Sequence, residues 1–303
     1  MRIFAALIAL ALVGQKPVVQ DPHPFQSAIE VTTIAATVFD KDGKIVAGLG
    51  REAFEIFEDG VQQRVTQFTN ERVPIGLGVL LDTSDSMYGK RIQDARATVD
   101  RFLFGLLAPA DEFFIVAFNH QVHVLTDWTS TPEVVRSALD SIKPWGATAV
   151  YDAVLRALPI IDRRSRQRAA LVIISDGDDT ASDATIREVR SALVRSDAFV
   201  YAIAIDPKDR RAINATTNPE ALREITNESG GRTEVVSTSD ELTAAAARIA
   251  EELNNQYVLG YTSPKGADGK FHSIRVHALG SDYRVRARNG YVATPVDRRH
   301  GPG

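Results

Sequence analysis

The chain has 303 residues, contains no cysteine and carries a formal net charge of −4 at pH 7. This length accommodates one large folded domain or two smaller ones. The absence of cysteine excludes disulfides, thiolate metal sites and cysteine nucleophiles. The slightly acidic charge balance argues against general binding to nucleic acid or to an anionic membrane.

The first residues have the pattern of a secretory signal peptide. Arg2 precedes a short apolar run, residues 3–13, which is shorter than the roughly 20 residues that a membrane helix needs, and small residues lie at its end. We therefore expect a signal peptide at 1–14, a polar linker at 15–27 and a secreted or periplasmic protein. No integral membrane segment is expected after cleavage. A buried first strand or helix is the alternative interpretation.

Residues 28–71 form an N-terminal segment with the pattern of β-strands. Val, Ile and Thr are frequent in its first part, and polar and apolar residues alternate over 54–58 and again over 61–68. Asp59-Gly60 separates these two runs and is a strong hairpin signal. We expect each run to be one continuous strand of that hairpin.

Residues 255–294 contain three further strand-like runs. Because neither this segment nor residues 28–71 is large enough to enclose a core alone, we expect the two to pair into one small β-sandwich-like domain. The tail, residues 295–303, is basic and contains Gly and Pro, and is expected to be disordered.

Residues 72–254 show a different pattern. Apolar runs typical of strands buried on both faces alternate with helical segments of ten or more residues; the runs are 75–81, 113–118, 169–175 and 199–205. This alternation predicts crossover connections, and therefore an α/β domain with a doubly wound, mainly parallel, Rossmann-like sheet covered by helices on both faces. Helices are expected at 182–196 and at 239–253, the second capped by Ser239.

Three loops of this domain carry oxygen-bearing side chains. Asp82-Thr83-Ser84-Asp85-Ser86 follows the first strand, Gly146-Ala147-Thr148 precedes a helix, and Ser175-Asp176-Gly177 follows the third apolar run. In a parallel α/β sheet, ligands bind at the carboxyl ends of strands. Carboxylate and hydroxyl oxygens suit a hard divalent cation such as Mg²⁺, Mn²⁺ or Ca²⁺. Neutral hydroxyls leave such a cation electron-poor and able to take an anionic oxygen from a partner.

A structural role is the alternative for some of these residues. Ser84, Ser86 and Thr148 each stand just before an expected helix, where Ser and Thr are favoured as caps. Capping does not account for Asp176. Asp178 and Asp179, beside it, are interpreted as exposed loop charge.

The order of these motifs resembles the von Willebrand factor type A domain, whose Asp-x-Ser-x-Ser motif is joined by a threonine and an aspartate from two later loops. The resemblance covers about residues 74–254 and implies six helices and a metal-ion-dependent adhesion site, or MIDAS. It implies that Ser84 and Ser86 bind the metal directly, that Thr148 binds directly or through water, and that Asp82 and Asp176 bind mostly through water.

The flanking segments resemble a bacterial group of exported proteins described as von Willebrand factor A-related. Phe54-Glu55-Ile56-Phe57-Glu58-Asp59-Gly60 and Tyr257-x-Leu259-Gly260-Tyr261 carry this resemblance. That group has no well-defined activity to carry over to this chain.

The expected function is metal-dependent binding or adhesion, in which the cation grips an Asp or Glu side chain of a partner protein. A spacer in a cell-envelope assembly with a vestigial metal site is one alternative, and a metal-dependent hydrolase is another. No histidine lies in the key loops, no Gly-x-Ser-x-Gly or phosphate-binding loop is present, and Ser84 stands where phosphotransfer enzymes carry a second acid. We therefore expect no enzymatic activity.

Overall fold

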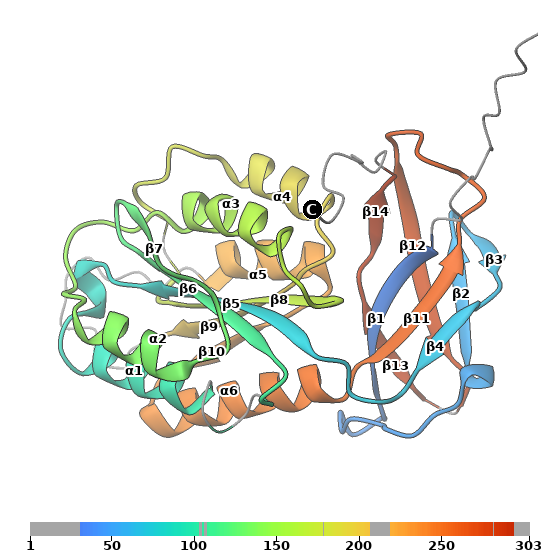
Figure 1. Ribbon diagram of the computed structural model, residues 1–303, viewed down its shortest axis with the longest axis horizontal. Helices are drawn as coiled ribbons and strands as arrows, with labels where there is room; N and C mark the ends of the chain where they lie inside the picture. The colour runs from blue at the N-terminus through green and yellow to red at the C-terminus, as the bar shows by residue number, and fades with distance from the viewer. Residues whose placement is uncertain are drawn as a thin grey trace, which may run out of the picture.

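The computed structural model describes residues 31–102, 105, 108–177, 179–206, 219–280 and 282–293. The expected signal peptide (1–14), linker (15–27) and tail (295–303) lie outside the described residues, as does Asp178. The described part of the chain forms an α/β domain and a β-domain that lie side by side (Figure 1). It contains no helix that is both long and apolar enough to span a membrane.

A six-stranded sheet forms the centre of the α/β domain, in the order β10-β9-β8-β5-β6-β7. All neighbours are parallel except β6 and β7. Every residue of β5, β8 and β9 is buried, as their continuous apolar runs predict. The strands are β5 (Ile75–Asp82), β6 (Glu112–Phe118), β7 (Val122–Thr129), β8 (Arg168–Ser175), β9 (Phe199–Ile205) and β10 (Thr233–Val236).

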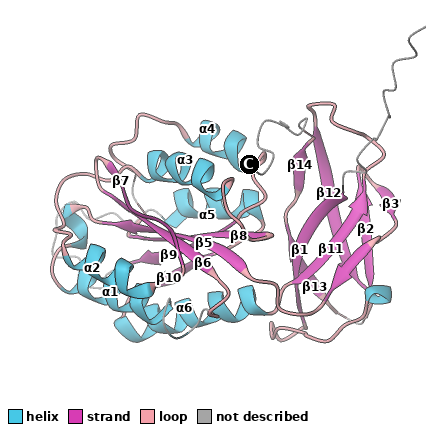
Figure 2. Cartoon of the chain, viewed as in Figure 1, coloured by secondary structure: helices cyan, strands magenta, loops and turns pink. Residues whose placement is uncertain are grey.

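Helices cover both faces of this sheet (Figure 2). Apolar side chains of α1, α2 and α6 pack in one core cluster and those of α3, α4 and α5 in the other. The helices are α1 (Lys90–Arg101), α2 (Pro132–Asp140), α3 (Val150–Ile161), α4 (Ile186–Leu193), α5 (Pro219–Ser229) and α6 (Ser239–Asn254). The doubly wound fold expected from the sequence is confirmed.

Two helix starts differ from the sequence prediction. Helix α4 begins at Ile186 rather than near Ser182, because Thr185 and Glu188 form a capping box. Helix α6 is capped by Thr238, whose hydroxyl accepts from the backbone N–H of Glu241, and not by Ser239. Ser239 instead donates its hydroxyl to Asp94 of α1 at 2.7 Å.

The β-domain consists of two four-stranded sheets, in the orders β13-β1-β11-β4 and β14-β12-β2-β3. Strand β1 pairs with β11 and β13, and β2 pairs with β12, so both sheets combine segments from the two sides of the α/β domain. A single core cluster lies between the sheets. The strands are β1 (Val31–Phe39), β2 (Phe54–Glu58), β3 (Val61–Gln63), β4 (Gln67–Thr69), β11 (Tyr257–Thr262), β12 (Phe271–Ala278), β13 (Arg284–Ala287) and β14 (Gly290–Val292). A short 3₁₀ helix, η1 (Arg51–Ala53), precedes β2.

The prediction of one continuous strand over residues 61–68 is wrong. Residues of β3 pair with β2 in one sheet, whereas those of β4 pair with β11 in the other. Thr66 lies between them and donates both its backbone N–H and its hydroxyl to the carbonyl of Gly260. These bonds fix the chain beside β11, so the residues after Thr66 pair with the other sheet.

The chain passes between the two domains at two adjacent points, before β5 and after α6 (Figure 1). The Arg72 side chain on the first connection donates to Asn254 Oδ1 on the second at 2.8 Å. Arg168, buried at the start of β8, donates to the carbonyl oxygens of Val73 and Leu253. Both connections therefore meet the sheet at its amino end.

Candidate metal site

The first candidate loop leaves the sheet at its topological switch point. Asp82 is the last residue of β5, and Ser175 is the last residue of β8, the neighbouring strand. The chain after β5 continues into α1 on one face, and the chain after β8 continues into α4 on the other. Such a divergence opens a crevice at the carboxyl ends of the two strands, which is where α/β proteins bind ligands.

Asp82 is fully buried and has two hydrogen-bond donors. Its Oδ1 accepts from the backbone N–H of Ser84 at 2.8 Å, and its Oδ2 accepts from Ser175 Oγ at 2.6 Å. Burial, followed by the negative charge of Asp176, raises the pKa of Asp82 to about 7. Two carboxylates buried in one region repel each other, so a positive charge placed beside them would stabilise their ionised forms.

Asp176 is also buried, at 7% exposure. The guanidinium of Arg91, on α1, approaches its carboxylate at 3.9 Å and also donates to the carbonyl of Ser86 at 2.5 Å. Arg91 thus offsets part of the negative charge from the side of α1. Because burial and the charge of Asp176 still raise the pKa of Asp82 in its presence, the compensation is incomplete.

The hydroxyls of Ser84 and Ser86 lie together, with their Oγ atoms 2.9 Å apart. Ser84 is buried and Ser86 is partly exposed. Ser84 precedes the short 3₁₀ helix η2 (Asp85–Met87), but its side chain makes no capping hydrogen bond. The capping alternative predicted for these residues is not observed at the α-helices either, since Gly89 precedes α1 and Ala149 precedes α3.

Backbone hydrogen bonds fasten the Thr148 loop to the Asp82 loop. Trp145 N–H donates to the carbonyl of Thr83, and Asp85 N–H donates to the carbonyl of Gly146, each at 2.9 Å. Thr148 itself is buried. Its carbonyl accepts from the backbone N–H of Thr180 at 2.8 Å, which links it to the segment after Asp176. The structure therefore brings all three candidate loops to one edge of the sheet.

The five predicted side chains offer two carboxylates and three hydroxyls. These hard oxygen donors fit Mg²⁺, Mn²⁺ or Ca²⁺ and not a soft metal. Within the described residues no group of three or more His, Cys, Asp or Glu side chains is arranged to hold a metal.

Asp179 has a different role from the exposed loop charge predicted for it. It is half-buried, and its carboxylate accepts from the backbone N–H of Tyr151 at 2.9 Å and from the hydroxyl of Ser182 at 2.7 Å. It therefore ties the loop after β8 to the start of α3. Ser175 was named in the sequence only as part of the third loop, and Arg91 was not indicated by the sequence pattern.

Two exposed aromatic side chains flank the site. Tyr88, directly after η2, is 77% exposed, and Trp145, in the Thr148 loop, is 55% exposed. The His120 ring packs edge-on against Trp145 with ring centroids 4.4 Å apart. The sequence pattern did not indicate that Tyr88 and Trp145 are exposed, because loop residues have no periodic pattern of burial.

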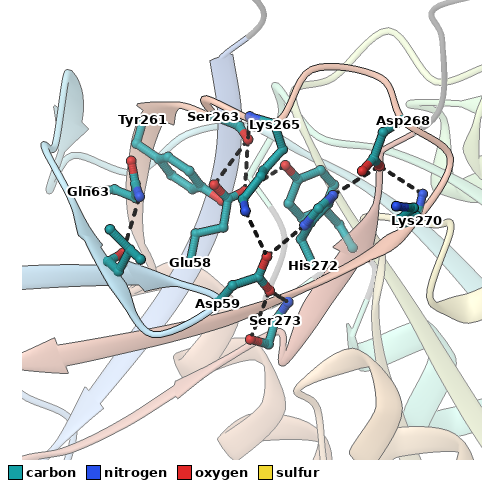
Figure 3. A network of polar contacts seen from close by, with 12 residues as sticks. Glu58, Asp59, Gln63, Tyr261, Ser263, Lys265, Asp268, Lys270, His272 and Ser273 are labelled. Atoms are coloured by element: carbon teal, nitrogen blue, oxygen red, sulfur yellow. Dashed lines mark hydrogen bonds and ion pairs between the residues drawn. The ribbon is translucent and has the colours of Figure 1, made fainter.

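A second cluster of titratable side chains lies in the β-domain (Figure 3). His272 Nδ1 lies 2.8 Å from Asp59 Oδ2, and its Nε2 lies 3.0 Å from Asp268 Oδ1. The Asp59 and Asp268 hydrogen bonds raise the pKa of His272. Beside them the buried Glu58 accepts hydrogen bonds from the hydroxyls of Tyr261 and Ser263. This cluster links the β2–β3 hairpin to the loop before β12.

Comparisons with known proteins agree with this architecture. A family model described as von Willebrand factor type A domain matches residues 77–178. Inter-alpha-trypsin inhibitor heavy chain H2 of Mesocricetus auratus is 21% identical over 235 residues, which cover 71% of this chain and 24% of that protein. The chain thus spans about a quarter of that relative's length.

Solved structures show the same fold. A von Willebrand factor type A protein from Catenulispora acidiphila superposes with a TM-score of 0.52 at 12% identity, over 90% of this chain and 76% of the other. An aerotolerance-related membrane protein from Bacteroides fragilis gives 0.50 at 21% identity, over 59% and 98% of the two chains. Residues 77–178 are thus similar in sequence to the von Willebrand factor type A domain, and the chain shares the fold of solved type A structures.

Proposed function

We propose that the α/β domain binds a divalent cation, Mg²⁺ or alternatively Mn²⁺ or Ca²⁺, and through it a carboxylate of a partner protein. Asp82, Ser84, Ser86, Thr148 and Asp176 would hold the cation. The observation that carries this proposal is the pair of buried carboxyl groups, Asp82 and Asp176, whose mutual repulsion and burial raise the pKa of Asp82 to about 7. A bound cation would relieve both effects.

The bound cation would supply a Lewis-acidic position for an anionic oxygen. Around it, the neutral Ser84 and Ser86 hydroxyls would complete the coordination without adding negative charge, so an Asp or Glu side chain of the partner would still be attracted. The exposed rings of Tyr88 and Trp145 beside the site would add apolar contact area, since aromatic residues are enriched at the centres of protein interfaces.

Type A domains are typically protein-interaction and adhesion modules, which supports binding as the general role. The relatives described above bear names that designate no enzymatic reaction. Near the site, the His120 ring packs on Trp145, and we infer that this ring acts as packing rather than as a catalytic base. We therefore propose a binding protein and not a hydrolase.

Export is part of the proposal. It rests on the signal-peptide pattern of residues 1–14. Mass spectrometry of the protein recovered from the periplasm or medium of a producing bacterium should show a chain that lacks about the first 14 residues. Recovery of the full-length chain in the cytoplasm would contradict it.

Isothermal titration of the full chain with Mg²⁺ and Mn²⁺ tests the cation site. We expect saturable binding that is lost in Ser84→Ala and in the double variant Asp82→Ala with Ser84→Ala. Ser141→Ala is the matched control, because the Ser141 hydroxyl bonds only to the nearby carbonyl of Ala138 at the end of α2. Absence of binding by the unmodified chain at millimolar metal refutes the site.

A pull-down with and without EDTA tests the partner. Proteins captured in Mg²⁺, released by EDTA and not captured by Ser84→Ala support the proposal. A set of partners that is indifferent to chelation supports instead the alternative of a structural spacer with a vestigial site.

A further inference from the structure

The two domains meet away from the Asp82 edge, on the side of the sheet where β10 begins. A hollow of about 410 Å³ opens between the turn that follows α5 and the edge strand β13. Arg232 contributes from the α/β domain, and Arg284 and Arg286 contribute from the β-domain. The remaining lining includes the amide side chains of Asn227 and Asn289, and no acidic side chain.

The three arginines that line this hollow differ in their partners. Arg286 binds the buried Glu252 carboxylate with bonds of 2.8 and 2.9 Å, and Arg232 lies 3.0 Å from Glu234 and 3.4 Å from Glu252. Arg248 also pairs with Glu234. Arg284 adds a third guanidinium to the lining and stands opposite Phe39 in the pairing of β1 with β13.

Among the lining arginines, Arg284 is the one whose donors are unused within the described residues. Arg284 is exposed at the start of β13, and among the described residues its side chain has no hydrogen bond or ion pair. Arg232 Nε is buried and makes no hydrogen bond, although it lies within ion-pair distance of Glu252. A guanidinium presents its N–H donors in a fork that matches the oxygens of a carboxylate or a phosphate.

We propose that this hollow binds a small, multiply charged oxyanion. Its volume lies in the range of small-molecule sites, which occur preferentially at domain junctions. Arg284 would grip the oxyanion, the neighbouring Arg232 and Arg286 would add positive charge, and the Asn227 and Asn289 amides would orient the ligand. Because Asn289 already donates to the carbonyl of Asn227 across the junction at 3.3 Å, a ligand here would bridge the two domains.

Titration calorimetry of the full chain with inorganic pyrophosphate and with citrate tests the proposal. Both are run without divalent cations, because both chelate metals and would otherwise report on the Asp82 edge. We expect saturable binding of at least one probe, weakened about tenfold or more in Arg284→Gln, the usual effect of losing a charge-assisted hydrogen bond. A preference for pyrophosphate identifies a phosphate ligand, and a preference for citrate identifies a carboxylate ligand.

Two matched variants make the result specific. Arg64→Gln removes an exposed arginine of the same β-domain that makes no ion pair with a described residue, and it should bind as the unmodified chain does. Ser84→Ala should also bind normally, which separates this site from the proposed cation site. Equal weakening in Arg64→Gln, or no saturation by either probe at about 10 mM, overturns the proposal.

Discussion

At the scale of single residues, Asp82 lowers the stability of the metal-free fold and is also a proposed ligand of the cation. Its carboxyl group is fully buried beside a second acid, Asp176. Burying uncompensated charge lowers the stability of the folded state. The residue that is most useful for a cation is therefore a source of instability when no cation is bound.

Asp82→Asn should consequently stabilise the metal-free protein. The amide keeps an oxygen to accept from Ser84 N–H and loses the charge that repels Asp176. We expect the unfolding midpoint in EDTA at neutral pH to rise, with a gain on the order of 1–3 kcal/mol. The same variant should show no further rise when Mg²⁺ is added. Thermal unfolding with and without Mg²⁺ measures both effects, and a lower midpoint in EDTA would contradict the argument.

His272 gives the β-domain a pH-dependent stability. Its pKa is raised in the folded state by hydrogen bonds to Asp59 and Asp268, and the pKa values of both carboxyl groups are lowered. The stability from His272 is therefore fully present below about pH 6.5, its unfolded value, and is lost as pH rises through its folded pKa. The stability from the carboxylates is present above about pH 4 and is lost in stronger acid.

Replacing the histidine should remove this dependence. We expect His272→Gln to be less stable than the unmodified chain between about pH 4.5 and 6.5, with a difference that shrinks in alkaline solution. Urea unfolding within this pH range and in alkaline solution measures the difference in the free energy of unfolding. His277→Gln, on the exposed face of the same strand β12, is the control. A difference that grows with rising pH would show that the sign is wrong.

At the scale of elements, helix starts are set by local hydrogen bonds that the hydrophobic pattern does not show. The sequence pattern predicted that α4 begins near Ser182. The structure begins it at Ile186, where the Thr185 hydroxyl accepts from Glu188 N–H and the Glu188 carboxylate accepts from Thr185 N–H. The Ser182 hydroxyl has other partners, because it accepts from the backbone N–H of Asp152 and donates to Asp179.

Thr185→Ala should destabilise α4. It removes the hydroxyl from the capping box, and we expect a loss of about 1 kcal/mol in the free energy of unfolding. Thr185→Ser keeps the hydroxyl and should restore most of that loss. Chemical denaturation of the three proteins measures the difference, and equal stability of the Ala and Ser variants would show that the box contributes nothing.

Strands buried on both faces were predictable, but the edge strand β7 was not. Each residue of β5 and β8 contacts helices or core on one side or the other, so the apolar run is continuous and can be recognised. Strand β7 lies at the edge, is only partly buried and has shifted register against β6. Buried and exposed residues therefore do not alternate regularly along β7, and the sequence pattern did not predict this strand.

The candidate site was predictable to the level of its loops. The order of strands and oxygen-bearing loops placed Asp82, Thr148 and Asp176 at one edge, because parallel strands end together. The positions of Arg91 and Trp145 depend on how α1 and the Thr148 loop pack in space. Contacts of that kind, between residues far apart in the chain, leave no mark on a local pattern.

At the scale of the whole molecule, Glu252 joins the domains. It lies on α6, is fully buried, and accepts from Tyr201 on β9 and from Arg286 on β13. One carboxylate thus connects the parallel sheet, the last helix and the β-domain. Its loss would leave Arg286 without its charge-assisted hydrogen bonds and would remove one of the two ion pairs of Arg232.

Glu252→Gln should therefore weaken the junction. We expect a loss of about 2 kcal/mol in the free energy of unfolding, because half-exposed Arg286 and Arg232 can be hydrated in part. Glu251→Gln, one position away and exposed, is the matched control and should change stability by less than about 0.5 kcal/mol. Differential scanning calorimetry measures both, and equal effects would exclude a special role for Glu252.

The two adjacent connections between the domains have a mechanical consequence. They meet the sheet at its amino end, whereas the Asp82 edge lies at its carboxyl end, about 25 Å away along the eight residues of β5. A partner pulling on that edge against an anchored β-domain would apply tension along β5, parallel to its axis. The ladders to β6 and β8 would then bear the load in shear, with many hydrogen bonds strained together instead of opened one after another. Such an arrangement suits a tether that must hold under traction.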